Sequence, residues 1–169
     1  MKVFALWSAL FISFSALLPS QTANGDKHLF DFWVGEWDLW WYGQDSSKEY
    51  GTNTIAKILD STVLHEDFVI TSGKNKGFKG QSFSTLEVNT KTWRQTWVDN
   101  SGAYMDFTGR NDGADRIFER ELTRGGKHIK QQMVFHDIAA ESFIWDWMRS
   151  DDDGKTWKPL WSIHYQRKK

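Results

Sequence analysis

Apolar and polar side chains alternate with a period of two from Trp37 to the end of the chain. This period is typical of β-strands that bury one face. Clusters of Gly, Asn, Asp and Ser interrupt it roughly every 8 to 14 residues, as turns do. The pattern predicts ten strands, at residues 36–42, 50–58, 62–71, 78–88, 92–98, 102–110, 115–123, 127–136, 141–149 and 157–167.

One segment before the strands has helical spacing instead. Within His28–Val34, the apolar residues Leu29, Phe32 and Trp33 lie at positions i, i+3 and i+4. This spacing places them on one side of a short helix.

The gaps between the predicted strands are too short for a crossover helix. Parallel pairing needs such a helix, so the strands must be joined as antiparallel hairpins. Ten sequential antiparallel strands close most simply into an up-and-down barrel, which makes the fold class all-β. A two-sheet sandwich is the alternative.

The chain is rich in tryptophan, with 11 Trp among 169 residues. Three alternating runs, Trp37–Trp41, Trp93–Trp97 and Phe143–Trp147, place large rings on single strand faces. Ten strands enclose more volume than eight, and side chains, water or a ligand must fill it. The composition therefore predicts an interior with aromatic walls.

Charge and cysteine content exclude several functions. The formal net charge is −1, which gives no electrostatic reason to bind nucleic acid. The absence of Cys excludes disulfides, a thiol nucleophile and a Cys-based zinc site.

The N-terminus has the pattern of an export signal. Lys2 precedes an apolar run of about 16 residues and a small-residue exit, which predicts a signal peptide over residues 1–23. The alternative, a membrane anchor, needs about 20 apolar residues. We therefore expect a periplasmic or secreted protein with one barrel domain, residues 24–169, and no membrane contact after cleavage.

Gly35 and Trp37 stand where the short helix meets the first strand, and Arg167 stands in the last strand. Glycine permits a tight turn from helix to strand. The Arg167 guanidinium could lie on the Trp37 indole. A Gly-x-Trp at the start and an Arg at the end are the arrangement of lipocalin-like, or calycin, barrels, so these residues are predicted to be structural.

The run Ser150–Trp157 fits the Asp-box pattern, Ser/Thr-x-Asp-x-Gly-x-Thr-Trp. Asp152 can accept hydrogen bonds from the turn backbone, Gly154 can adopt a positive φ, and Trp157 can pack beneath. Asp-boxes recur in sialidase propellers, but one copy does not build a propeller. We therefore predict a structural hairpin clamp.

Polar residues within strands are the candidates for chemistry. Glu66 would have a raised pKa inside a barrel and could act as a general base, and the adjacent His65 is the alternative. Both faces of this strand are mixed, so the other interpretation is that Glu66 or His65 simply faces solvent. Gln95 could hold a ligand by hydrogen bonds, with Arg94 as its counterpart if the faces are exchanged. The predicted ligand-binding residues are Trp41, Glu66, Trp93, Arg94, Gln95, Trp97, Trp145 and Trp147, with Trp33 and Trp37 as further walls or floor.

The chain resembles an uncharacterised bacterial family whose members carry Phe-Asp-Phe-Trp-x-Gly-Glu-Trp near the start, here Phe30–Trp37. Further matching segments are Leu64–Phe68, Gly80–Phe83, Trp93–Asp99, Gly109, Ser150–Trp157 and Tyr165–Arg167. The resemblance implies a calycin-like barrel and a secreted setting, but no established reaction. A more distant similarity is to nitrobindin-like haem barrels, which have a His near the last strand.

These observations leave four functions open. The first is a carrier of a small apolar or aromatic molecule. The second is an isomerase or cyclase that uses Glu66 or His65, and the third is a haem barrel with His164, His136 or His65 as axial ligand. The fourth is a structural or partner-binding protein with a filled core. No metal site is predicted, because no histidines and carboxylates have suitable spacing.

Overall fold

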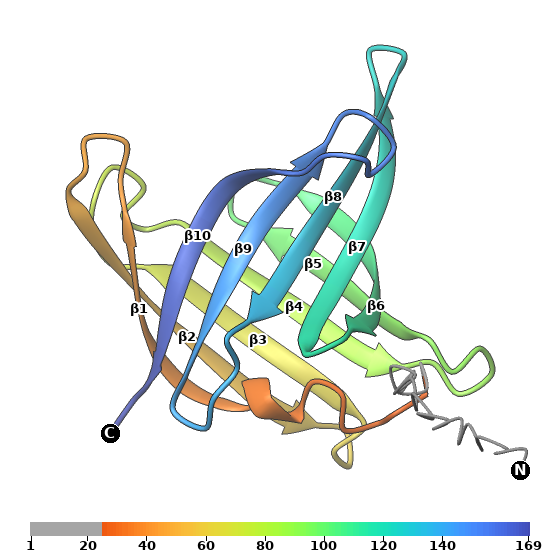
Figure 1. Ribbon diagram of the computed structural model, residues 1–169. Coiled ribbons are helices and arrows are strands. Elements are labelled where there is room, and N and C mark those ends of the chain that lie inside the picture. The colour runs from red at the N-terminus through yellow and green to blue at the C-terminus, as the bar shows by residue number, and fades with distance from the viewer. Residues whose placement is uncertain (1–24) are drawn as a thin grey trace, which may run out of the picture.

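The computed structural model describes residues 25–169 and shows a closed barrel of ten antiparallel strands (Figure 1). Each strand pairs with the next in the chain, and β10 pairs with β1 to close the barrel. The strands are β1 (Gly35–Tyr42), β2 (Lys48–Ile58), β3 (Val63–Ile70), β4 (Lys79–Leu86), β5 (Trp93–Asp99), β6 (Tyr104–Asp112), β7 (Asp115–Arg124), β8 (Lys127–His136), β9 (Ser142–Ser150) and β10 (Lys158–Arg167). The predicted all-β, up-and-down calycin-like barrel is confirmed, and the sandwich alternative is wrong. The predicted signal peptide, residues 1–23, lies outside the described residues.

The segment before β1 closes one end of the barrel (Figure 1). Phe30 is fully buried there and stacks on Phe118, with ring centroids 4.2 Å apart. Trp93 meets Phe30 edge to face at 5.1 Å and donates its indole N–H to the carbonyl of Asp26. These aromatic contacts fill the end of the barrel with protein.

The predicted helix over His28–Val34 is shorter than its spacing indicated. It is a 3₁₀ helix, η1, of three residues, Asp31–Trp33. Hydrogen bonds between residues three apart, such as the Trp33 N–H to the Phe30 carbonyl at 3.2 Å, set a repeat of three residues. This repeat turns Phe30 and Trp33 together into the core, a pairing that the α-helical spacing did not predict.

Gly35, Trp37 and Arg167 form the predicted structural cluster. The Arg167 guanidinium lies 4.2 Å from the centre of a Trp37 ring and donates to the Val34 carbonyl at 3.1 Å. Gly35 has φ of +140°, and a Cβ there would collide with the guanidinium. Glycine is needed at this position because of both its backbone conformation and the space that the arginine takes.

The Asp-box is the turn between β9 and β10. The Ser150 hydroxyl donates to Asp152 at 2.8 Å and accepts the Gly154 N–H at 2.8 Å. Asp152 accepts both the backbone N–H and the hydroxyl of Thr156, and these bonds lower its pKa to about 2. Gly154 has φ of +85° and lies over the Trp157 ring. The box holds a hairpin together, as predicted.

Over residues 25–169, the structure contains no helix of the length and apolar character needed to cross a membrane.

Candidate functional site

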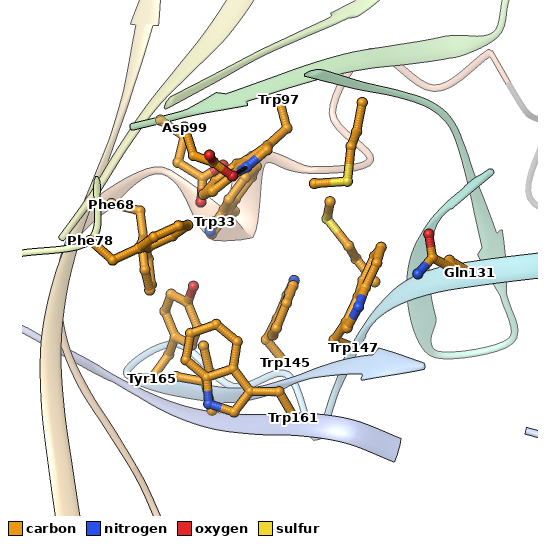
Figure 2. A pocket seen from close by; sticks show the side chains of 14 residues that line it. Trp33, Phe68, Phe78, Trp97, Asp99, Gln131, Trp145, Trp147, Trp161 and Tyr165 are labelled. Carbon is orange, nitrogen blue, oxygen red and sulfur yellow. Dashed lines mark hydrogen bonds between the residues drawn. The ribbon is translucent and has the colours of Figure 1, made fainter. Parts of the chain in front are cut away.

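A cavity of about 310 Å³ lies inside the barrel (Figure 2). This volume falls at the lower end of the ~300–1,000 Å³ range typical of small-molecule sites. The lining is mostly aromatic and sulfur-containing, with a few polar groups. The lining residues are Trp33, Glu66, Phe68, Phe78, Trp97, Asp99, Met105, Gln131, Met133, Trp145, Trp147, Trp161, Ile163 and Tyr165.

Indole rings form one wall of the cavity. Trp145 and Trp147 are two residues apart on β9, so both face inward, and their rings are nearly parallel, at 5°, with centroids 6.3 Å apart. Trp161 of β10 meets Trp145 edge to face at 5.9 Å.

Within the described residues, no acceptor takes the indole N–H of Trp33, which is 2% exposed. A bound molecule with an acceptor atom could satisfy this donor.

On the opposite wall of the cavity, a glycine allows a tryptophan ring to pack closely against the neighbouring strand. Trp97 lies against Gly80 of the neighbouring strand, and a Cβ on Gly80 would overlap the indole ring. The Trp97 N–H donates to Asp99 at 3.1 Å. Asp99 also accepts from Ser101 and from the Ala103 N–H, and these bonds lower its pKa against the opposing effect of burial.

Glu66 brings a carboxyl group into the apolar interior. It lies on β3 and accepts hydrogen bonds from Asn53 at 2.7 Å and from the Ser82 hydroxyl at 2.6 Å. Burial raises its pKa to about 7, although these two bonds act in the opposite direction. Glu66 can therefore hold or release a proton near neutral pH.

Glu66 belongs to a cluster of buried, hydrogen-bonded polar side chains that extends over the neighbouring strands. Asn53 also donates to the Tyr165 hydroxyl at 3.1 Å, and burial followed by the charge of Glu66 raises the pKa of Tyr165. Gln95 donates to Ser84 at 3.0 Å and to Ser82 at 3.3 Å. The cluster connects four neighbouring strands and β10, so it fixes the orientation of the Glu66 carboxyl.

The structure brings together four of the predicted ligand-binding residues: Glu66, Trp97, Trp145 and Trp147 line the cavity. Trp33, proposed as wall or floor, also lines it. Gln95 is buried in the polar cluster beside Glu66. Trp37 belongs to the closed end of the barrel.

Three of the predicted ligand-binding residues do not line this cavity. Trp93 points inward but packs on Phe30 at the closed end, below the cavity. Arg94 is exposed on the outer face, because it alternates with the buried Gln95. Trp41 donates to Glu49 at 2.9 Å and borders a second, more polar hollow at the open end of the barrel.

The candidate histidines all lie on the outer face of the barrel. His65 stacks on the partly exposed Phe83 at 4.9 Å, so it cannot replace Glu66 as a base in the cavity. His164 stacks on Trp40 at 3.7 Å, and His136 bonds to Asp146 at 3.1 Å. The histidines therefore do not fit the role of axial ligand to a haem in this cavity.

Several lining residues were not predicted from the sequence. Trp161, Ile163 and Tyr165 lie two residues apart on one face of the last strand, so the same period that selected Trp145 and Trp147 indicated them. Asn53 and Ser82, which bond to Glu66 without lining the cavity, gave no such signal, since small polar residues are common on either face of a strand. Among residues 25–169, no group of three or more His, Asp or Glu side chains is arranged to hold a metal ion.

The fold and the site define a class: a closed antiparallel β-barrel with an aromatic-lined internal cavity. A scan against protein-family models and a search of curated proteins each found no match to the chain.

Proposed function

We propose that the barrel binds a small apolar or aromatic molecule in its internal cavity, and that the chain is exported to the periplasm or secreted. The observation that carries the binding proposal is the cavity of about 310 Å³ with five tryptophans and two phenylalanines in its wall. Such rings gain much buried area and stack on a flat ligand. The unpaired Trp33 N–H and the Glu66 carboxyl supply the few polar contacts that orient a ligand. The N-terminal pattern of residues 1–23 supports export.

The direct test is a substitution that fills the cavity with a larger side chain. Met105 lines the cavity from β6, where it pairs with Trp97 of β5, and Met105→Trp would place a further ring in the space. Titration with N-phenyl-1-naphthylamine, a neutral dye that fluoresces in apolar surroundings, should show binding to the wild type. We expect the variant to bind about tenfold more weakly or worse, since overpacking leaves no room for the dye.

The matched control is Val98→Trp, which adds the same ring on the outer face of the adjacent strand, where Val98 is 40% exposed. This variant should bind the dye as the wild type does. Equal binding by Met105→Trp and the wild type would contradict a site in the cavity.

A second candidate function is catalysis of proton transfer, as in an isomerase or cyclase, in the same cavity. Glu66 favours it, because a carboxyl with a pKa of about 7 is matched to general acid–base work at neutral pH. The carboxylate would take a proton from one position of the ligand, and the resulting acid would return it at another.

Small molecules that co-purify with the wild-type protein provide the test of catalysis. If one of these molecules is a substrate, it should gain mass when it is incubated with the wild-type protein in deuterated water, because a deuteron replaces the transferred proton. Glu66→Gln should retain binding and lose the exchange. Exchange at the wild-type rate in this variant would rule out Glu66 as the base.

A further inference from the structure

An arginine that the sequence did not single out faces the inside of the barrel beside the cavity. Arg120 of β7 is half-buried and donates its Nε–H to Gln131 at 2.8 Å. Gln131 lines the cavity. The guanidinium also lies 5.6 Å from the ring of Phe107, which meets the cavity residue Trp147 at 6.0 Å. Arg120 is thus one side chain away from the indole wall.

Arg120 lies just beyond the point where the pairing between β6 and β7 ends. The ladder between β6 and β7 runs only from Thr108 and Glu119 to Asp112 and Asp115. Arg120 is the first residue of β7 beyond this ladder, while β7 continues its pairing with β8 towards the tip of their hairpin (Figure 1). The side chain therefore has its one hydrogen-bonding side-chain partner on β8 rather than on β6.

The positive charge of Arg120 has no close counter-ion among residues 25–169: its one side-chain hydrogen-bond partner, Gln131, is neutral. Partial burial lowers the pKa of Arg120, and the charge of Asp106, on the outer face of β6, acts against this. An arginine remains protonated at neutral pH in either case. The neighbouring inward-facing Arg149, by contrast, is paired with Asp151 at 2.6 Å.

The carboxylates of the cavity do not neutralise this charge. Glu66 is bonded to Asn53 and Ser82. Asp99 takes its hydrogen bonds from Trp97 and from the turn that follows β5. A half-buried guanidinium without an anion next to an apolar cavity is suited to a bidentate carboxylate or sulfonate.

We propose that the ligand is an organic anion, with its apolar or aromatic body among the indoles of Trp145 and Trp147 and its carboxylate or sulfonate on Arg120. This inference rests on the proposed function and specifies its ligand class. The cavity takes the hydrophobic part of the molecule, and Arg120 selects the anion over its neutral analogue.

Two dyes with the same ring system test the selection. Anilinonaphthalene-1-sulfonate carries an anionic group, and N-phenyl-1-naphthylamine lacks it. We expect Arg120→Gln to weaken binding of the anionic dye about tenfold or more and to leave the neutral dye unchanged, because a charge-assisted hydrogen bond is lost. Arg120→Lys should retain part of the affinity for the anion.

The control is Arg94→Gln, which removes a positive charge from the outer face and should change neither dye. Circular dichroism and a urea titration check that each variant is folded. Unchanged anion binding in Arg120→Gln, or an equal loss for both dyes, would overturn the inference while the cavity still binds the neutral dye. If neither dye bound the wild type, the proposed function would fail together with it.

Discussion

Replacing Trp37 with alanine is expected to lower the free energy of unfolding by about 3–5 kcal/mol, which is a large part of the stability of a typical domain. Trp37 is 1% exposed and meets Phe143 edge to face at 4.9 Å. Its N–H donates to the Trp33 carbonyl at 2.8 Å, which ties η1 to β1. The variant would lose the buried ring, this bond and the surface on which Arg167 lies.

Urea unfolding followed by circular dichroism measures the effect. Tyr42→Ala on the same strand is the control, because Tyr42 is 66% exposed and its removal should cost little. Trp37→Phe should fall between the two, since it keeps a ring but loses the hydrogen bond. A Trp37→Ala variant within about 1 kcal/mol of the wild type would show that this cluster does not hold the closed end.

The second large effect is a dependence of stability on pH that comes from Glu66. Burial raises the pKa of Glu66 from 4.5 to about 7 in the folded protein. The folded state therefore holds this proton more tightly than the unfolded state does. The stabilisation from the proton is complete below about 4.5 and is lost as the pH rises through about 7. The difference corresponds to about 3 kcal/mol.

Glu66→Gln is expected to remove this dependence. Glutamine has the same shape, can accept from Asn53, and can donate to the Ser82 hydroxyl after that group rotates. The variant should therefore be more stable than the wild type above pH 7 and similar to it near pH 4.5.

The measurement is the free energy of unfolding in urea at several pH values, taken as the difference between the wild type and Glu66→Gln. Taking the difference removes the contributions of groups that the substitution leaves unchanged. Asp67→Asn is the control, because Asp67 is adjacent but exposed on the outer face. A constant difference across the range would show that folding does not shift the pKa of Glu66.

The same proton bears on ligand choice. A neutral Glu66 can donate a hydrogen bond to the ligand, whereas the ionised form can only accept. Glu66, which titrates near neutral pH, lines the cavity, and Arg120, which stays positive, lies behind the lining residue Gln131.

The order of strands and their pairing could be predicted from the sequence. The period of two, the turn residues and the short gaps allow only hairpin-linked antiparallel strands. The motif of Gly35, Trp37 and Arg167 was also readable, because glycine conformation and cation–π stacking are local requirements. The mid-strand position made Glu66 and His65 candidates without showing which of them faces inward, and the structure places Glu66 on the cavity.

Only the tertiary structure decided which inward-facing rings line a cavity and which fill the core. Trp93 and Trp97 share one face of β5, yet the first packs on Phe30 and the second lines the cavity. The two residues differ in their position along the barrel axis. Trp93 lies nearer the closed end, where it contacts the segment before β1, and Trp97 lies further from that end. Likewise, only the structure shows that the ladder between β6 and β7 ends beside Arg120 and that this side chain bonds to the cavity residue Gln131. Alternation along a strand encodes the face of a side chain, whereas depth and neighbours arise from contacts between segments far apart in the chain.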